Sequence, residues 1–412
     1  VLSILPLIGF KPDIIHCHDW QTGLIPVYLH DSFQSDPFFW GIKTIFTIHN
    51  LKFQGTWSVD TIKGFSGLSD YYFTSDKLEA YGNGNMLKGG LVYADRITTV
   101  SRSYASEIRM PFYGEGLDGL LRARSKQLSG IVNGIDYNVY NPKTDKDIAV
   151  NYSVEDVIKA KAANKTALQK ELGLEENPDA FMLGIVSRLT DQKGLDLVEC
   201  VLDQICAEDV QLVVLGTGEG KYQDMFTYYS RKYPERVSAN IFYSEALSHR
   251  IYASCDAFLM PSLFEPCGLS QLMSLRYGTL PIVRETGGLR DTVTPYNEVD
   301  GTGTGFSFTN YNAHEMLAII RYAKKTYFND RRAWNEMVLR AMKQDFSWDA
   351  SAREYEKLYD GLIEEEARRK EAIRLQQARE AAEAALKEAE KALELAKRAE
   401  TRQKMKEQRL PK

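Results

Sequence analysis

The hydrophobic positions of the chain form short apolar runs that alternate with stretches of helical periodicity. This alternation is typical of parallel α/β units, in which each buried strand is followed by a helix that covers the sheet. In the first part of the chain, the runs expected to form buried strands are residues 13–17, 43–48, 96–100 and 128–132. In the second part, they are residues 181–186, 210–215, 239–243, 257–260 and 280–283.

The two groups of strands predict two domains joined by a polar, helix-prone segment at 141–177. A chain of 412 residues is long enough for this, since one core rarely exceeds about 250 residues. Amphipathic patterns predict helices at 314–327, 331–343 and from 348 onward. The expected divisions are a first domain at 1–145, a second at 160–330, further helices at 331–362 and a tail at 363–412.

The tail differs in composition from the rest of the chain, being dominated by Glu, Lys, Arg and Ala. From Glu364 to the end it has 14 Lys and Arg against 11 Asp and Glu. We expect a solvated single helix held by ion pairs between residues four apart. The alternative is a weak coiled coil with some self-association, along a short heptad stripe formed by Ala382, Leu386, Ala389, Leu393 and Ala396.

Composition narrows the possible partners and compartments. The net charge of -5 argues against nucleic-acid binding, which needs a basic surface. Five cysteines without CxxC spacing indicate neither a disulfide framework nor a zinc site, and favour the cytoplasm. There is no apolar run of about 18 residues, so we expect no membrane-spanning helix. The first residues show no basic leader and no cleavage pattern.

The most specific charged cluster follows the predicted strand 181–186. Its sequence is SRLTDQKG, with Arg188 and Lys193 five residues apart on a strand-to-helix turn. A guanidinium can bind two phosphate oxygens and an ammonium acts as a point charge, so the pair suits a diphosphate. A helix expected at 195–206 would add the positive end of its dipole. The alternative is that both are unrelated surface cations.

A second cluster, PSLFEPCGLSQ, follows the predicted strand 257–260. The Glu265 carboxylate can bind sugar hydroxyls, although a simple helix cap is the alternative. Gly268 and Leu269 are expected to begin a helix whose N–H groups suit a phosphate or sugar oxygen. Two glycine turns after other strands could also bring backbone amides close to an anion, or could simply be turns. Their residues are Gly216 and Gly218, and Thr286, Gly287 and Gly288.

Two polar clusters also follow predicted strands in the first domain, HCHDW at 16–20 and IHN at 48–50. Ligands of open parallel sheets bind beyond the carboxyl ends of the strands. Clusters at strand ends in both domains therefore predict a sugar-binding cleft between them. We expect His18 and Asp19 to face the cleft, and His16, placed on the opposite side of the strand, to serve packing.

Several strings together resemble the bacterial glycogen synthase and starch synthase family, in the order in which the family has them. They are HDWQTGLIPVYL, FTIHNLKFQG, ADRITTVS, VNGID, VSRLTDQKG, the long segment from SHRIYASCDAFLMPSLFEPCGLSQ to TGGLRDTV, and GTGFSF. The resemblance runs from about residue 10 to about residue 358. Few other families combine HDW, IHN, SRLxxQKG and EPCGL.

The resemblance implies the α/β GT-B fold, two Rossmann-like domains facing across a cleft, here with a long charged C-terminal helix. It also implies retaining transfer of glucose from ADP-glucose to the non-reducing end of an α-1,4-glucan, without metal or cofactor. Arg188 and Lys193 would stabilise the diphosphate leaving group. Glu265 would lie beside the transferred glucose, with His49 on its other face, and Asp19 would match an aspartate implicated in catalysis.

The resemblance further assigns donor contacts to Asn85 for the sugar, to Tyr243 for the nucleobase, and to Cys267 near the donor. The full set of residues expected to bind the donor is Asn85, Gly216, Gly218, Tyr243, Cys267, Gly268, Leu269, Thr286, Gly287 and Gly288. No metal ligands and no membrane or nucleic-acid partner are expected.

The sequence departs from the family pattern in three respects. Retaining enzymes of this fold often carry E-x7-E, but the eighth residue after Glu265 is Met273, which favours glucan synthases over sucrose or mannosyl relatives. The family's Lys-x-Gly-Gly-Leu loop does not occur in the chain. We therefore expect an incomplete first domain, short by about 100 residues, and weak or absent activity of the chain alone. The tail after Leu362 exceeds the family's usual end.

Two further functions are weighed against glucan synthesis. One is another GT-B transferase of the sucrose or trehalose type, although those sequences lack the HDW and IHN pair and EPCGL. The other is a non-catalytic scaffold that binds glucan or nucleotide, since a sheet lacking strands would expose edges able to recruit a partner.

Overall fold

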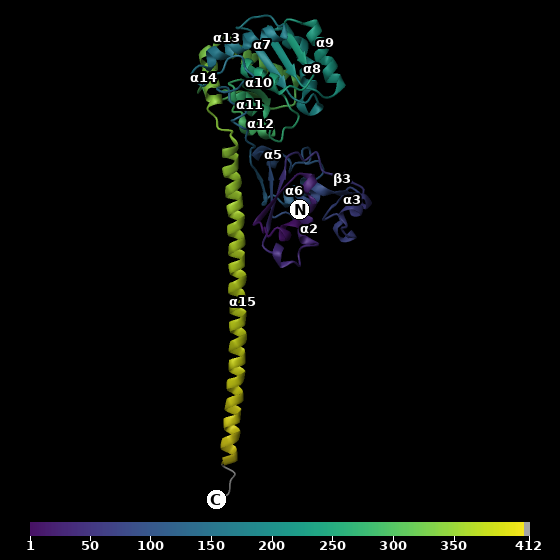
Figure 1. The fold of residues 1–412 in the computed structure, drawn as a ribbon, viewed down its shortest axis with the longest axis vertical. Coiled ribbons are helices and arrows are strands. Elements are labelled where there is room, and N and C mark those ends of the chain that lie inside the picture. Colours follow the sequence, from purple (N-terminus) through teal and green to yellow (C-terminus); the bar gives the residue numbers. More distant parts are fainter. Residues whose placement is uncertain (408–412) are drawn as a thin grey trace. The chain divides into compact units, whose positions relative to one another are not determined.

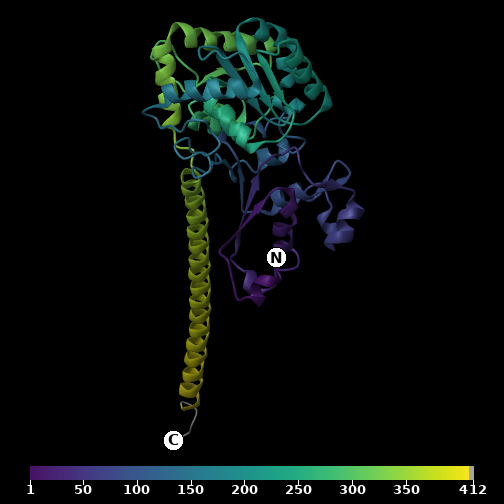
Figure 2. The same ribbon diagram turned by 45° about the horizontal axis from the view of Figure 1, so that its top comes forward.

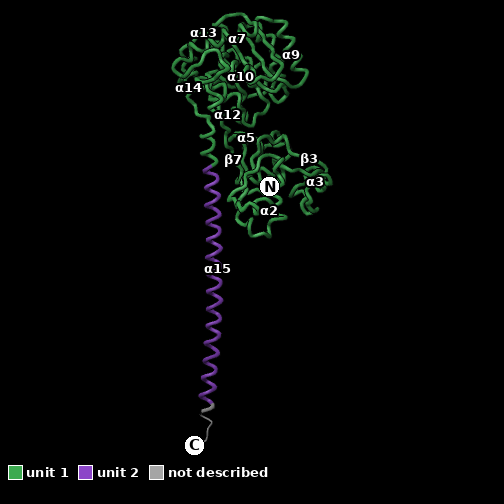
Figure 3. Tube along the Cα trace, in the orientation of Figure 1, with its two compact units in different colours: residues 1–355 green, residues 356–412 purple. Residues whose placement is uncertain are grey.

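The computed structural model describes residues 1–407 of the chain. The chain forms two compact units, Val1–Tyr355 and Glu356–Lys412, which Figure 3 shows in different colours. The last five residues of the predicted tail, 408–412, lie outside the described residues. The first unit contains two parallel sheets and one small antiparallel sheet.

The larger sheet has six strands, all parallel, in the order β10-β9-β8-β11-β12-β13. Its strands are β8 (Phe181–Val186), β9 (Val210–Leu215), β10 (Val237–Asn240), β11 (Ala257–Met260), β12 (Leu280–Arg284) and β13 (Phe306–Phe308). The helices that follow or precede them are α7 (Val157–Leu172), α8 (Leu195–Ala207), α9 (Gly220–Lys232), α10 (Glu245–Ser254), α11 (Ser270–Arg276), α12 (Gly287–Thr292), α13 (Ala313–Asn329) and α14 (Arg331–Met342).

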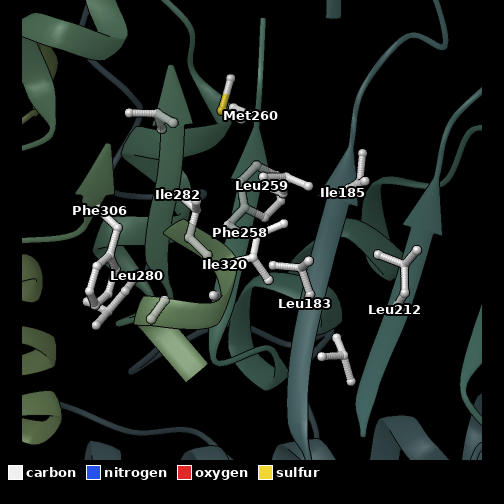
Figure 4. Packing of buried hydrophobic residues seen from close by; sticks show 14 of the residues in the cluster. Leu183, Ile185, Leu212, Phe258, Leu259, Met260, Leu280, Ile282, Phe306 and Ile320 are labelled. Atoms are coloured by element: carbon white, nitrogen blue, oxygen red, sulfur yellow. The ribbon is translucent and has the colours of Figure 1, made fainter. Parts of the chain in front are cut away.

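Helices cover both faces of this sheet, because β8 and β9 are apolar at nearly every position, Gln211 of β9 being a buried polar residue (Figures 1 and 2). Successive side chains of a strand point to opposite faces. Leu183 and Leu212 therefore pack in the main core together with Ile320 of α13, as Figure 4 shows. Met182 and Val213 lie in a separate cluster with residues of α7 and α10.

The smaller parallel sheet has four strands in the order β1-β2-β6-β7. They are β1 (Ile14–His18), β2 (Lys43–Ile48), β6 (Arg96–Thr99) and β7 (Leu128–Gly130). Helices around it are α1 (Ile4–Leu7), α2 (Leu24–His30), α3 (Val59–Ser66), α4 (Met86–Tyr93), α5 (Arg102–Glu107) and α6 (Asp118–Ala123). A three-stranded antiparallel sheet, β3-β5-β4, is formed by the same part of the chain, with β3 (Thr56–Trp57), β4 (Glu79–Ala80) and β5 (Asn83–Asn85). We call the part of the chain that contains the smaller parallel sheet the first half, and the part that contains the larger sheet the second half.

Most of the predicted strands are confirmed, but one is displaced and several are new. The strand predicted at 239–243 is wrong in position, since β10 covers Val237–Asn240. Its partner β9 ends at Leu215, opposite Asn240, so later residues have no strand beside them. The short strands β13, β3, β4 and β5 were not predicted, because runs of two or three residues carry no readable period.

The tail is helical, as predicted. Helix α15 covers Trp348–Glu407, and residues 371–405 are all exposed. Ion pairs between residues four apart support it, among them Arg379 with Glu383 and Arg398 with Glu394. Among the described residues, no helix has the length and apolar character needed to cross a membrane.

A buried ion pair joins α7 to the residue that directly precedes β11, an inner strand of the larger sheet. Lys165 Nζ lies 2.6 Å from Oδ2 of Asp256, and the two side chains are 3% and 9% exposed. The same carboxylate oxygen accepts a hydrogen bond from the backbone N of Met182 at 2.8 Å. Removing one partner of such a pair leaves a buried charge without compensation.

We expect Asp256→Ala to lower the free energy of unfolding by about 3 kcal/mol, since Lys165 would lose its partner. Urea denaturation followed by circular dichroism measures this. The control is Glu336→Ala, which breaks the exposed pair between Arg332 and Glu336 and should cost less than about 0.5 kcal/mol. Similar losses in both variants would contradict the prediction.

A polar line crosses three strands of the smaller sheet. His16 Nε2 lies 2.6 Å from Thr47 Oγ1, which lies 2.5 Å from Thr98 Oγ1. The expectation that His16 and His18 lie on opposite sides of the strand is wrong. Their rings are stacked with centroids 4.3 Å apart, because residues two apart in a strand share a face. Burial first, then the nearby His18 and His49 rings, lower the pKa of His16 to about 4.

We expect His16 to make stability depend on pH. Its folded pKa lies below the 6.5 of an ordinary histidine, so the unfolded chain takes up the proton first and stability falls as pH drops from about 6.5 towards 4. Because the ring is only partly buried, solvent screening limits the loss near pH 5 to about 1 kcal/mol. Urea denaturation at about pH 7.5 and pH 5 measures it. His16→Gln should lose less stability over this interval, and an equal loss would contradict the assignment.

Candidate active site

The order of the strands in the larger sheet places a crevice between β8 and β11. From β8 the chain moves outward to β9 and β10, then returns to β11 on the other side of β8 and moves outward to β12 and β13. The loops after β8 and β11 therefore leave in opposite directions. Ligands of open parallel sheets bind at such a reversal. These two loops carry Arg188, Lys193 and Glu265.

Lys193 and Glu265 meet in this crevice. Lys193 Nζ lies 2.6 Å from Glu265 Oε2, and the two side chains are 16% and 7% exposed. Ser262 Oγ donates to the same oxygen at 3.0 Å. Among the described residues, Oε1 of Glu265 accepts no hydrogen bond, so one carboxylate oxygen is available to a ligand.

The loop that carries Arg188 and Lys193 is held by close backbone packing. A Cβ on Gly194 would lie 2.0 Å from the carbonyl oxygen of Pro261, and the residue has a φ of +69°. Only glycine fits there, because the left-handed backbone and the contact both exclude a side chain. The loops after β8 and β11 are therefore packed directly against each other.

The Arg188 side chain is exposed, and within the described part of the chain it has no hydrogen bond or ion pair. Gly216 and Gly218 lie behind its loop. A Cβ on Gly216 would lie 1.9 Å from the Ser187 carbonyl oxygen, and one on Gly218 would lie 2.2 Å from that of Leu189. In this structure, these two glycines allow the loop to pack closely and so support the placement of Arg188.

The loop after Glu265 leads into α11. Gly268 has a left-handed φ of +72°, and Leu269 is the residue before the helix, which begins at Ser270 rather than at Gly268. Cys267 is buried, and this burial raises the pKa of its thiol to about 12. A thiol with this pKa is protonated at neutral pH, so Cys267 is suited to packing rather than to nucleophilic attack.

The glycine turn at Thr286 to Gly288 already has protein partners. The Gly287 N–H donates to Glu107 Oε1 at 2.9 Å, and the Gly288 N–H donates to the Glu265 carbonyl at 3.0 Å. The Thr286 hydroxyl lies 3.2 Å from the same Glu107 oxygen. An anion does occupy this turn, but it is a carboxylate of the chain itself.

Tyr243 follows β10 at the same edge of the sheet. Its side chain is 85% exposed, and Ser244 after it caps α10. An exposed ring at the carboxyl edge of the strands is accessible to a planar group such as a nucleobase.

In the smaller sheet, Asp19 and His49 are in direct contact. Asp19 Oδ1 accepts a hydrogen bond from the backbone N of His49 at 2.7 Å, and its own backbone N donates to the Thr47 carbonyl. The backbone of Asp19 has a φ of 54° and a ψ of -177°, a conformation that side chains disfavour. The exposed His18 contributes Nδ1 at 3.0 Å from His49 Nε2. Three strand-end residues thus form one cluster.

Asn85 is hydrogen-bonded to Gln54, on the loop that follows His49. Its Nδ2 donates to Gln54 Oε1 at 2.6 Å, while its Oδ1 caps α4 by accepting from the backbone N of Lys88 at 2.8 Å. The side chain is buried. Gln54 lies on the loop that follows His49, so Asn85 supports that loop from behind.

Contacts between the two halves bring the clusters together. Lys52, on the loop after His49, places its Nζ 6.0 Å from the centroid of the Phe264 ring, next to Glu265. Ser101 Oγ donates to the Pro266 carbonyl at 2.6 Å. Sequence reasoning missed both Lys52 and Ser262. Both residues lie within sequence motifs that carry the family resemblance, Lys52 in FTIHNLKFQG and Ser262 in PSLFEPCGLSQ. Lys52 is also the positively charged residue of its motif.

The chemistry of the site follows from this arrangement. Arg188, Lys193 and Lys52 supply positive charge to a crevice that suits a diphosphate. Glu265 and the Asp19–His49 cluster supply polar groups that suit a sugar.

Both halves of the chain are similar in sequence to known protein families. The starch synthase catalytic domain family matches residues 1–123, and the glycosyl transferases group 1 family matches residues 166–338. A glycogen synthase of Lachnospira eligens is 69% identical over 361 residues, which cover 88% of this chain and 76% of that protein.

Two solved structures have the same architecture. The catalytic domain of starch synthase IV from Arabidopsis thaliana, bound to ADP and acarbose, has a TM-score of 0.81 at 35% identity, covering 88% of this chain and 75% of that one. Sucrose-phosphate synthase from Thermosynechococcus elongatus has a TM-score of 0.56 at 18% identity, covering 88% and 76%, and this likeness concerns the fold alone. The fold is thus that of GT-B glycosyltransferases, with two Rossmann-like domains, and the chain belongs to the glycogen synthase family.

Proposed function

We propose that this glycosyltransferase transfers glucose from ADP-glucose to the non-reducing end of an α-1,4-glucan, with retention and without a metal ion. The observation that carries the proposal is the Lys193–Glu265 pair at the strand reversal, beside the exposed Arg188. The related starch synthase IV bound to ADP and acarbose supports both the nucleotide and the glucan-like ligand.

Lys193 and Arg188 are proposed to bind the diphosphate of the donor. Without a donor, Lys193 pairs with Glu265, so the charge of Lys193 is compensated within the protein. A diphosphate brings more negative charge than one carboxylate and attracts Lys193 more strongly. As the bond between sugar and phosphate breaks, charge grows on the leaving phosphate, and the two cations stabilise that transition state.

Glu265 is proposed to bind hydroxyls of the transferred glucose. Its Oε1 has no hydrogen bond among the described residues, and Oε2 becomes available when Lys193 turns to the phosphate. The carboxylate is also proposed to lie where positive charge develops on the sugar during transfer. Its negative charge therefore favours the transition state over the bound donor.

The first half is proposed to contribute the other face of the sugar site. Asp19 fixes the backbone of His49, whose ring or carbonyl would stabilise the oxocarbenium-like centre. Asn85 has a second N–H on Nδ2 beyond the one given to Gln54, and this group is proposed to contact the sugar.

The remaining donor residues are proposed to act in two ways. Tyr243 would stack on the nucleobase, and the amides near Gly268 and Leu269 would contact the donor. The residues whose part is to shape the loops around the donor are Gly216, Gly218, Cys267, Thr286, Gly287 and Gly288.

The decisive assay is incorporation of labelled glucose into glycogen, with ADP-, UDP- and GDP-glucose as alternative donors. We expect Arg188→Ala and Lys193→Ala each to lower kcat about 100-fold, because each removes charge stabilisation of the leaving group. Isothermal titration with ADP should show binding about tenfold weaker in both. The control is Arg332→Ala, which removes an exposed arginine of α14 and should leave both measurements unchanged.

Three results would count against the proposal. Wild-type chain that binds ADP but transfers no glucose would support a non-catalytic nucleotide-binding module instead. Preference for UDP- or GDP-glucose would favour a transferase of the sucrose or trehalose type. Unchanged transfer in both variants would remove the assigned roles of Arg188 and Lys193.

A further inference from the structure

One segment of the first half makes a series of polar contacts with the second half. We call residues 101–113, which comprise α5 and the turn after it, the seam segment. Ser101 donates to the Pro266 carbonyl, and the backbone N of Ser103 donates to Asp291 at 2.8 Å. The remaining contacts join Glu107 to Thr286 and Gly287, and the Tyr113 hydroxyl to Arg284 at 3.3 Å.

Glu107 makes the most specific of these contacts. Its Oε1 accepts from the Gly287 N–H at 2.9 Å, and both carboxylate oxygens lie within 3.3 Å of the Thr286 hydroxyl. Thr286 is fully buried, and Gly287 has a left-handed φ of +47°. The carboxylate thus fixes the first residues of α12 from the opposite half of the protein.

The fixed turn in turn holds Glu265. The Gly288 N–H donates to the Glu265 carbonyl at 3.0 Å. A Cβ placed on Gly287 would lie only 1.9 Å from the same carbonyl oxygen, so the two backbones touch with no space between them. A shift of Thr286 and Gly287 therefore moves Glu265 directly.

Arg284, at the end of β12, holds the preceding part of the Glu265 loop. Its Nε donates to the Ser262 carbonyl at 2.8 Å, and its guanidinium also contacts the Leu263 carbonyl. Ser262 donates to the Glu265 carboxylate. The loop is thus fixed on both sides of Glu265 by residues that also contact the seam segment.

We propose that Glu107 is a positioning residue for glucosyl transfer, one that sets the place of Glu265 through Thr286, Gly287 and Gly288 whenever the two halves are docked. The inference rests on the proposed function, since it concerns the same site. Glu107 contacts Thr286 and Gly287 rather than the Glu265 carboxylate or Lys193. Its effect comes through the backbone, and a small displacement of a group beside the reacting sugar strongly lowers the rate.

The contact between Ser103 and Asp291 offers a matched comparison. It also joins α5 to α12 across the two halves, and Ser103 Oγ lies 2.5 Å from Asp291 Oδ1. Asp291 is exposed, however, and its side chain is not bonded to the Glu265 loop. Loss of this contact weakens docking without loosening the Thr286–Gly288 turn.

The experiment compares Glu107→Ala, Glu107→Gln and Ser103→Ala in the full chain. Glutamine keeps an acceptor for the Gly287 N–H and an amide group beside the Thr286 hydroxyl, so it tests geometry rather than charge. The measurements are kcat and KM for ADP-glucose, the Kd of ADP by calorimetry, and hydrogen exchange of the Gly287 and Gly288 amides without any ligand.

We expect Glu107→Ala to lower kcat about tenfold or more while KM and the ADP Kd change less than about threefold, because the diphosphate cations are untouched. Exchange of the two glycine amides should accelerate in the same variant. Glu107→Gln and Ser103→Ala should both stay within about threefold of wild-type kcat.

Two results would overturn the positioning role while leaving the proposed function intact: a kcat for Glu107→Ala within about threefold of wild type, or an equal loss in Ser103→Ala. Failure of the proposed function is seen separately, as wild-type chain that transfers no glucose. In that case the positioning role for transfer falls with it, and exchange of the glycine amides still reports whether Glu107 holds the turn.

Discussion

The reversal of strand order between β8 and β11 is the constraint on which the site depends. Because the chain leaves β8 in one direction and β11 in the other, no crossover helix fills the space beyond their ends. Arg188, Lys193 and Glu265, up to 77 positions apart in the chain, meet there for this reason. The glycines beneath the loops then allow the close backbone contacts between these loops. The Lys193–Glu265 pair compensates the charge of Lys193 at the strand reversal, whereas the exposed Arg188 has no such pair among the described residues.

The sequence predicts the strands and loops whose structure depends on residues close together in the chain. Strands such as Phe181–Val186 are runs of consecutive apolar residues, and their periodicity and length indicate buried parallel strands without knowledge of the fold. The residues after them could be assigned to a site because parallel strands place their carboxyl ends on one edge. The displaced β10 shows the limit, since its end is set by where β9 stops rather than by its own side chains. The prediction that His16 and His18 lie on opposite sides of the strand was wrong, because side chains two residues apart in a strand point to the same face.

Other parts of the site could not be predicted because they depend on contacts between distant segments. The Glu107 carboxylate accepts a hydrogen bond from Gly287, which lies 180 positions later in the chain. The sequence around either residue gives no indication of this contact. Asn85 shows a related ambiguity. An asparagine before a helix is a good cap, and it is also a good sugar ligand, so the residue type alone supports both. In the structure its Oδ1 is used as a cap, which leaves only an N–H for a ligand.

The turn at Thr286 to Gly288 shows most clearly that contacts between distant segments cannot be predicted from local sequence. Its sequence indicates an anion site, and in the structure a backbone amide and a hydroxyl there both contact the Glu107 carboxylate. Amide donors do not distinguish a phosphate from a carboxylate. In this structure the turn holds a carboxylate, because α5 packs against α12 and places Glu107 against the Gly287 N–H. The turn thus joins the two halves, with the Gly287 N–H bonded to Glu107 and the adjacent Gly288 N–H bonded to the Glu265 carbonyl.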